Sequence, residues 1–372
     1  MDLTAHTLDL TLATPFRISR SVQTLAHNVL TRIDAEGLEG IGEAAPSGFY
    51  GERRESVFMA LSDFGEHIEA DPSLIEDIVT RMDRRLHANA AAKASVDMAL
   101  YDLLGKRLGA PVYQLLGLNP DRTPLTSFTI GIDEPAAMAR KAAEAAKRYP
   151  ILKIKVGTDH DLEIVRAIRE ATDVTLRVDA NAAWTPKQAI RVIRELEPYN
   201  LEFVEQPLEP TDLEGLRFVR EHVTLPIIAD ESCETESDIP KLVGVVDGIN
   251  IKLMKCGGIH HALRMIHTAR AHHLKVMLGC MIESSLAITA AAHLSPLVDY
   301  ADLDGNLLVS DDPWEGVQVE QGKLILPDRA GLGVRPRDHD AKRQALATAT
   351  SSSRHSRRAA RVEVDEEVVE EE

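Results

Sequence analysis

The chain has 372 residues, of which 44% are hydrophobic, and it carries a formal net charge of −17. This length suits one large domain or two medium ones with a sizeable core. So acidic a chain is a poor partner for nucleic acid or for an anionic membrane surface, and its sequence shows no apolar run long enough to cross a bilayer.

Residues 1–120 are predicted to form an α+β capping domain. Alternating apolar and polar residues predict strands over 3–12 and 28–35, with residues 15–27 as the loop between them. The glycine- and proline-rich stretch that follows, 37–52, is predicted to consist of turns and loop. Helical apolar spacing then recurs over 52–66, 73–88 and 91–107.

After residue 120, short β-rich runs alternate with helical ones at a spacing of about 25 residues, which is typical of βα units on a parallel sheet. Eight such runs favour a closed (β/α)₈-type barrel over 121–304, capped by the N-terminal domain. A doubly wound open sheet is the alternative, but no G-x-G-x-x-G follows the first strand. The predicted strands are 125–130, 151–156, 174–179, 201–205, 226–230, 248–253, 275–279 and 299–303.

The second of these strands, ILKIKVG, carries two lysines on one face. Successive side chains on a strand point to opposite faces, so Lys153 and Lys155 would face the barrel interior while Ile154 and Val156 face the helices. Two ammonium groups in a closed interior repel each other and lose hydration, and both effects lower a lysine pKa toward the neutral range. Solvated lysines on an edge strand are the alternative for this motif alone.

Four consecutive predicted strands end, or nearly end, in an ionisable residue: Asp179, Glu205, Asp230 and Lys252. Barrel active sites lie at the C-terminal ends of the strands, so the three carboxylates should converge. Their mutual repulsion calls for a cation, and ligation by oxygen alone suits one Mg²⁺ per subunit. A single Asp at a strand end is commonly a helix N-cap, but capping does not explain three carboxylates in register.

The second and sixth predicted strands would lie on opposite sides of this metal, so Lys155 and Lys252 would face each other across whatever it holds. A carboxylate held by Mg²⁺ has a weakly acidic α-proton, which a lysine can remove to leave an enediolate. A base on each face allows the proton to leave on one side and return on the other, which inverts the carbon. Lys153 would tune Lys155 or contact the substrate carboxylate.

Residues 305–337 return to β-like, glycine- and proline-rich sequence, and we expect them to pack back onto the capping domain. From residue 338 the apolar periodicity is lost, and a basic cluster precedes an acidic block. This pattern predicts a disordered tail over 338–372.

These motifs resemble the enolase superfamily, and within it the muconate-lactonising-enzyme subgroup, over residues 1–337. The resemblance rests on KIK, VDAN, EQP, ADES, NIKL and the helix AKASVDMALYDLLGK. It implies that the three strand-end carboxylates bind Mg²⁺ and that the lysines of the second and sixth strands are the acid/base pair. It also implies that Asn181 and Glu231 support the ligands from behind.

The eighth predicted strand resembles that of the dipeptide epimerases in this subgroup. DYADLDGNLL places Asp302 and Asp304 two residues apart, and the resemblance implies that the pair binds the α-ammonium of a dipeptide. A solvated strand-end turn is the alternative for D-x-D alone. The exit from the seventh strand, GCMIESSLAITAAAH, is also similar, and we expect further substrate contacts from Cys280, Met281, Ile282 and Thr129.

The capping loops, 16–27 and 46–54, are expected to set specificity for the second residue of the substrate. An Ala-Glu substrate calls for a cation opposite its side-chain carboxylate, and Arg20 is the best candidate, with a solvated surface arginine as the alternative. Phe49 and Tyr50 favour an apolar dipeptide instead.

We therefore predict a Mg²⁺-dependent dipeptide epimerase that inverts the C-terminal residue by 1,1-proton transfer. The same fold also serves a lyase or cycloisomerase, such as o-succinylbenzoate synthase, N-acylamino acid racemase or muconate cycloisomerase, and a non-catalytic metal-binding scaffold is a more remote alternative. We expect a homo-oligomer. Three cysteines without metal-type spacing and an N-terminus without a signal-peptide pattern predict a cytoplasmic location.

Overall fold

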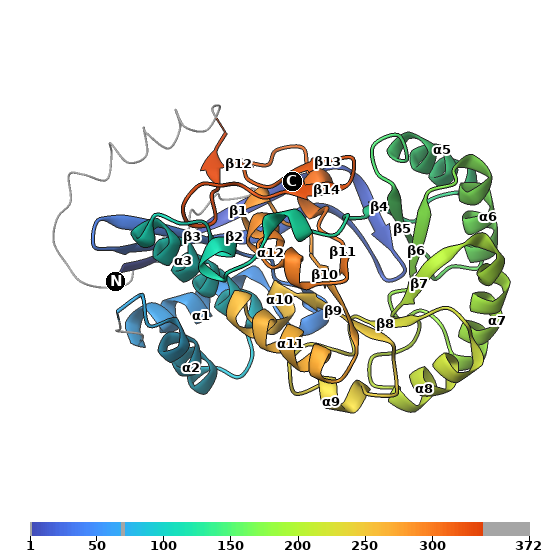
Figure 1. Cartoon of the computed structure of the whole chain (residues 1–372), viewed down its shortest axis with the longest axis horizontal. Coiled ribbons are helices and arrows are strands. Elements are labelled where there is room, and N and C mark those ends of the chain that lie inside the picture. The colour runs from blue at the N-terminus through green and yellow to red at the C-terminus, as the bar shows by residue number, and fades with distance from the viewer. Residues whose placement is uncertain (1, 68–70, 338–372) are drawn as a thin grey trace, which may run out of the picture.

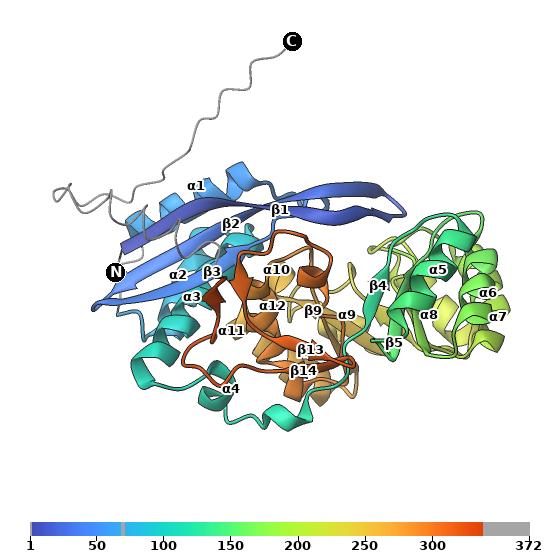
Figure 2. The same cartoon turned by 90° about the horizontal axis from the view of Figure 1, so that it is seen from above.

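The computed structural model describes residues 2–67 and 71–337, so the predicted tail at 338–372 lies outside the described residues. The N-terminal strands and helices lie on one side of the molecule, and a ring of helices around parallel strands forms the other (Figure 1). In both views the segment that follows the barrel runs back beside the N-terminal sheet (Figure 2).

The N-terminal sheet is antiparallel and consists of β1 (Asp2–Ile18), β2 (Ser21–Ala35) and β3 (Leu38–Ala44). The predicted loop at 15–27 is wrong, because β1 and β2 continue as a hairpin in which Phe16 pairs with Gln23. Residues 13–25 are exposed or half-buried on both faces, so the alternation that marks a strand is missing there. The prediction of turns and loop over 37–52 is also wrong in part, because this stretch contains β3. Its glycines indicated turns, but glycine also occurs in strands where another backbone approaches closely.

The predicted helices of the capping region are present as α1 (Arg54–His67), α2 (Ile75–Arg85) and α3 (Ala90–Leu108). Helix α3 is buried along most of its length and packs against β3 and α10 (Leu253–Cys256). It ends at Gly109, whose φ of 70° is the left-handed conformation that favours glycine at a helix C-terminus. The short helix α4 (Val112–Leu115) follows.

Gly42 brings β3 into direct contact with the backbone of α3. A Cβ atom at this position would lie 1.9 Å from the carbonyl oxygen of Ser95. We expect Gly42→Ala to lower the free energy of unfolding by about 1–3 kcal/mol, because either the strand or the helix must move. Denaturant unfolding checks this, with Gly48→Ala as the control, since a Cβ there meets nothing within 4 Å. Equal stability of the two variants would contradict this packing.

The barrel is a parallel sheet whose eight strands follow one another in sequence order. An isolated parallel bridge between Thr126 and Ala301 joins its two edges, so the predicted (β/α)₈-type barrel is confirmed. The first and eighth strands are shorter than predicted. The strands are β4 (Phe128–Ile130), β5 (Ile151–Lys155), β6 (Thr175–Asp179), β7 (Leu201–Glu205), β8 (Ile227–Ala229), β9 (Gly248–Lys252), β10 (Lys275–Gly279) and β11 (Tyr300–Ala301).

Amphipathic helices cover the outside of the barrel; α7, for example, buries positions 189, 192, 193 and 196 along one face. Among the described residues, no helix has the length and apolarity needed to cross a membrane. The covering helices are α5 (Pro135–Ala145), α6 (Asp161–Ala171), α7 (Pro186–Leu196), α8 (Leu213–His222), α9 (Ile239–Leu242), α11 (Ile259–Ala271) and α12 (Ser285–Ala292).

The segment after β11 forms two small antiparallel sheets and touches the N-terminal region at several points. Ser310 N donates to Thr11 O at 2.8 Å, and Val112 N donates to Gly331 O at 3.0 Å. The sheets pair β12 (Trp314–Glu315) with β15 (Arg335–Pro336) and β13 (Gln318–Glu320) with β14 (Lys323–Ile325).

Helices α2 and α3 also meet the barrel helix α11 through charged groups. Asp97 on α3 accepts from the backbone N–H of Ile259 at the start of α11. On the same barrel helix, His261 Nε2 lies 3.1 Å from Asp83 Oδ2, and Lys93 Nζ lies 2.9 Å from Asp83 Oδ1. This joint fixes the capping helices against the barrel.

The ion pair of His261 predicts a pH-dependent contribution to stability. Burial lowers the pKa of His261, but the nearby carboxylates of Asp83 and Glu236 outweigh it and raise the pKa to about 9. A pKa raised on folding stabilises the protein fully below the unfolded value of about 6.5 and is lost as pH rises through about 9. The difference in melting temperature between the wild type and His261→Gln should therefore shrink between pH 6.5 and 9.5. A difference that stays constant or grows over this range would contradict the ion pair, and His267→Gln on the exposed face of α11 is the matched control.

Candidate active site

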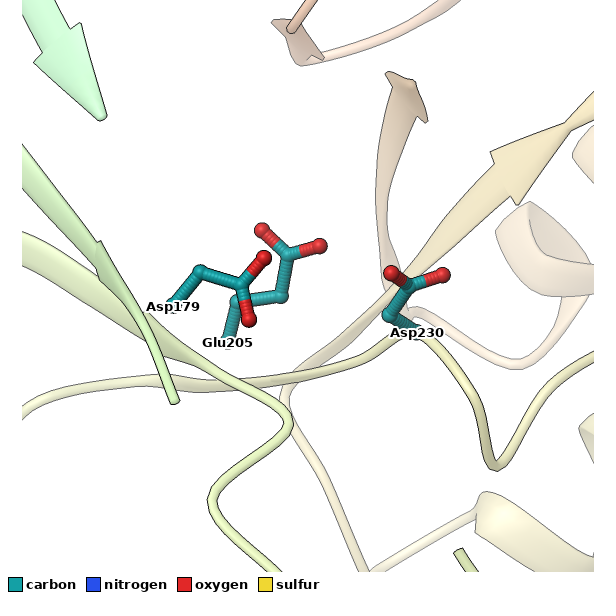
Figure 3. Close-up of side chains that lie close together, drawn as sticks. All are labelled: Asp179, Glu205 and Asp230. Atoms are coloured by element: carbon teal, nitrogen blue, oxygen red, sulfur yellow. The ribbon is translucent and has the colours of Figure 1, made fainter. Parts of the chain in front are cut away.

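Three buried carboxylates meet at the C-terminal ends of neighbouring barrel strands. Asp179 ends β6, Glu205 ends β7, and Asp230 directly follows β8. Asp179 and Glu205 are paired across the two strands, and ligand atoms from all three side chains lie within 4.8 Å of one another. Figure 3 shows the carboxylates directed into one shared space. The structure thus brings the predicted triad together.

Three residues that sequence reasoning missed hold this triad in place. Asn250 Nδ2 donates to Glu205 Oε1 at 2.8 Å, and Gln206 Oε1 accepts from the backbone N–H of Asp230 at 2.9 Å. The fully buried Lys255 donates to Asp230 Oδ1 at 2.7 Å and to three backbone carbonyls. Asn250 was detectable, because it lies two positions before the lysine of β9 and shares its face. Lys255 lies in α10, beyond the strand register, and gave no such signal.

Lys153 lies at the centre of the site and is only 2% exposed. Its Nζ lies 2.7 Å from Glu205, 2.8 Å from Asp302 and 3.1 Å from Asp179. Burial lowers the pKa of Lys153, but the surrounding carboxylates outweigh it and raise the pKa well above its usual value. The predicted lowering is therefore wrong for this lysine, because acids rather than a second ammonium group dominate its surroundings.

Lys155 and Lys252 approach the triad from its two sides. They end β5 and β9, which are four positions apart in an eight-stranded barrel and therefore lie opposite each other. Lys155 Nζ lies 2.6 Å from Asp179 Oδ2, and Lys252 Nζ lies 2.7 Å from Asp230 Oδ2. Burial lowers the pKa of Lys252, yet the charge of Asp230 outweighs it and raises the pKa.

Asn181, Glu231 and Arg20 form a connected group beside the triad. The backbone N–H of Asn181 donates to Asp179 Oδ1 at 2.8 Å, and its side-chain amide donates to Glu231 Oε1 at 3.3 Å. Arg20 is ion-paired with Glu231 at 2.8 Å and lies over the ring of Phe49, 4.2 Å from its centre. The predicted specificity arginine therefore reaches the site, with its charge already paired.

Asp302 and Asp304 follow β11 and both line the same cavity. Asp302 accepts from Ser127 Oγ at 2.6 Å and from Lys153, while Asp304 Oδ2 accepts from the backbone N–H of Thr129 at 2.6 Å. Burial and then the charge of Asp302 raise the pKa of Asp304 to about 7. The two carboxylates are buried, which excludes the solvated-turn alternative.

A cavity of about 540 Å³ opens above these groups, between the barrel and the N-terminal hairpin. The hairpin and the loop after β3 contribute a mixed outer wall, in which the apolar side chains of Phe16, Ile18, Val22 and Phe49 lie among polar ones such as Gln23. The predicted site residues in its lining are Lys153, Lys155, Lys252, Asp302, Asp304, Thr129, Cys280, Met281, Ile282, Arg20 and Asn181. The cavity is large enough for a small peptide.

The donor set of the triad fits a hard divalent cation. Its ligand atoms are all carboxylate oxygens, which Mg²⁺ prefers, and nearby donors already fix two of the carboxylates. Burial, and after it the charge of Asp179, raises the pKa of Glu205, so the carboxylate of Glu205 is destabilised as an anion beside the other two. A cation among them would relieve that repulsion.

Comparison with known proteins identifies the family to which this architecture belongs. Residues 2–117 match the family described as mandelate racemase/muconate lactonizing enzyme, N-terminal domain, and residues 137–341 match the family described as enolase C-terminal domain-like. The chain belongs to the mandelate racemase/muconate lactonizing enzyme family of the enolase superfamily. The predicted family is thus confirmed.

This enolase-superfamily chain is 43% identical over 335 residues to the L-Ala-D/L-Glu epimerase of Bacteroides thetaiotaomicron, covering 90% of this chain and 88% of the relative. It is 44% identical over 335 residues to the hydrophobic dipeptide epimerase of Enterococcus faecalis, covering 86% and 94%. A crystal structure of the dipeptide epimerase from Enterococcus faecalis, complexed with Mg and the dipeptide L-Leu-L-Tyr, superposes with a TM-score of 0.86 at 42% identity, covering 90% of this chain and 98% of the other.

Proposed function

We propose that the protein is a Mg²⁺-dependent dipeptide epimerase that inverts the α-carbon of the C-terminal residue by 1,1-proton transfer. One observation carries the proposal: the amines of Lys155 and Lys252 enter one cavity from opposite sides of a buried carboxylate triad. The epimerase names of the relatives, and the Mg and dipeptide held by the Enterococcus faecalis structure, support it.

The chain's own residues divide the work. The three triad carboxylates would hold Mg²⁺, which when bound supplies positive charge that stabilises the charge left on the substrate carboxylate after its α-proton leaves. One of Lys155 and Lys252 takes that proton, and the other delivers a proton to the opposite face of the carbon. Each lysine is the base in one direction and the acid in the other. Lys153, enclosed by three carboxylates, fixes Asp302 and the triad.

Asp302 and Asp304 are the recognition groups for the substrate's α-ammonium. They are buried acids in the lining of the cavity, beside Thr129 and near the loop of Cys280 and Ile282. Asp302 is already paired with Lys153, so among the described ion pairs it is Asp304 that lacks a cation, and a substrate ammonium group would supply one. This feature distinguishes a dipeptide from an N-acylated amino acid or a dicarboxylate.

A dipeptide library in D₂O with Mg²⁺ tests the proposal. The library includes L-Ala-L-Glu and apolar L,L-dipeptides, because Arg20 suits an acidic second residue and Phe49 an apolar one. At least one member should take up deuterium at its C-terminal α-carbon while it converts to the L,D form. If no dipeptide exchanges, while succinylated amino acids or muconate are turned over, the proposal is wrong.

Asp304→Asn should weaken the binding of dipeptides selectively. Losing a buried charge opposite the ammonium should raise KM by about 30-fold or more, with a smaller effect on kcat. Asp304 is a cleaner target than Asp302, since the latter also pairs with Lys153. Steady-state kinetics check this, and a same-fold cycloisomerase or an N-acylamino acid racemase would tolerate the change.

The homo-oligomeric state, the cytoplasmic location and the domain boundaries near residues 120 and 304 remain predictions from the sequence. Size-exclusion chromatography with light scattering would test the assembly.

A further inference from the structure

Glu43 is a buried carboxylate that the proposed mechanism leaves without a role. It lies on β3 and is 0% exposed. It accepts hydrogen bonds from Asn28 Nδ2 at 2.7 Å, from the backbone N–H of Ser284 at 3.0 Å, and from Ser284 Oγ. The N-terminal sheet thus binds the barrel where the loop after β10 meets the start of α12.

The loop bound in this way, 280–284, forms part of the cavity wall. Asn28, itself in the cavity lining, also donates to the carbonyl of Ile282 at 3.0 Å, and Met281 N donates to Glu283 Oε1 at 2.8 Å. Two strands of the N-terminal sheet therefore fix the loop, through Asn28 from β2 and Glu43 from β3.

The same loop touches the segment that carries the two recognition acids. Cys280 Sγ donates to the carbonyl of Asp302 at 3.3 Å. Gly305, directly after Asp304, lies so close that a Cβ atom there would be 2.3 Å from Met281 O. A displacement of the loop would therefore move the backbone on which those acids stand.

We propose that Glu43 is a positioning residue that holds the loop 280–284, and through it Asp302 and Asp304, in the geometry that binds the dipeptide. The inference rests on the proposed function for the identity of the substrate, whereas the contact between Glu43 and the loop is independent of that function. Glu43 touches neither the triad nor the two lysines among the described contacts, so it should act on substrate binding alone. The capping sheet then sets the affinity of the barrel site through one buried carboxylate.

Hydrogen–deuterium exchange of the full chain tests the contact without any need for turnover. Glu43→Gln keeps the shape, but it removes the negative charge and places an NH2 group against the Ser284 hydroxyl, so the hydrogen bond donated by the Ser284 amide becomes weaker. Peptides covering 280–288 should exchange about tenfold faster, while peptides of β9 stay unchanged. Ser284→Ala, which keeps the backbone donor, should give an increase of about threefold and serves if Glu43→Gln does not fold.

Enzyme kinetics and metal binding distinguish a role of Glu43 in positioning the loop from a general loss of stability. Glu43→Gln should raise the dipeptide KM by about tenfold, with kcat within about twofold of the wild type and an unchanged Mg²⁺ affinity by calorimetry. Asp102→Asn is the matched control, since Asp102 is a carboxylate of α3 with similar burial that binds Ile41 N and Leu332 N, away from the loop. It should lower the melting temperature without changing KM.

Unchanged exchange at 280–288 in both variants would overturn the inference, and so would faster exchange spread equally over all peptides, as expected from global destabilisation. Faster loop exchange with an unaltered KM would overturn it too. If the wild type turns over no dipeptide, the proposed function fails, and the exchange data still decide whether Glu43 holds the loop.

Discussion

Replacing either Lys155 or Lys252 by alanine should reduce the interconversion of L,L- and L,D-dipeptides by about 10²–10⁴-fold. Inversion needs a proton donor on one face and an acceptor on the other, so the loss of one amine stops both directions. The two amines stand opposite each other across the cavity, and each lies within 3 Å of an outer carboxylate of the triad. Coupled polarimetric or chiral-chromatographic assays measure the effect.

Lys275→Ala is the matched control for these variants. Lys275 also lies on a barrel strand, but at the opposite end, where it is exposed and pairs with Asp299. Its replacement should leave turnover within about twofold of the wild type. Full activity of either Lys155→Ala or Lys252→Ala, in a protein that is folded by circular dichroism, would exclude a two-base mechanism.

Glu205→Gln should have the second largest effect, on metal affinity. Glu205 is the middle carboxylate of the triad, and its replacement removes one of three anionic ligands from a buried site. The dissociation constant for Mg²⁺ should rise by at least about 100-fold, since even residues that only orient ligands change affinity by 10–100-fold. Calorimetric titration of the metal-free protein checks this directly, without substrate.

Glu209→Gln, at an exposed position four residues further along the chain, is the control and should bind Mg²⁺ as the wild type does. Chelation by EDTA should abolish turnover, and added Mg²⁺ should restore it. Unaltered Mg²⁺ binding by Glu205→Gln, or full activity after chelation, would show that the triad is not the metal site.

The parts of the site that follow strand register could be predicted from the sequence. Asp179 and Glu205 occupy the last positions of adjacent strands, and parallel strands bring such ends to one edge of the barrel. Lys155 and Lys252 follow from the same rule, together with the count of strands between them. Period-two alternation and strand order therefore sufficed for the centre of the site.

The parts that depend on long-range contacts could not be predicted. The charge of Arg20 is paired with Glu231, and Lys153 is enclosed by acids that end or follow three different strands, which no local pattern records. Because of these acids, the pKa of Lys153 is raised, whereas the sequence predicted that it would be lowered. The hydrogen bond from Ser284 N to Glu43 is another such long-range contact, since it joins the N-terminal sheet to the barrel.

The hairpin that covers the cavity was missed for a different physical reason. Strand signals come from burial on one face, and residues 13–25 are exposed or half-buried on both. Backbone pairing, such as that of Phe16 with Gln23, and polar contacts to the barrel, such as the ion pair of Arg20 with Glu231, hold this part of the hairpin. A strand that serves to cover a site, rather than to form core, leaves little trace in the sequence.

The stereochemistry of proton exchange in the lysine variants tests the central claim most directly. Each single variant, incubated with Mg²⁺ in D₂O, should exchange the C-terminal α-proton of only one epimer, because one base remains on one face. Proton NMR of the separate L,L- and L,D-dipeptides should show Lys155→Ala exchanging one epimer and Lys252→Ala the other. Exchange of the same epimer by both variants, or of both epimers by either one, would contradict two bases placed on opposite faces.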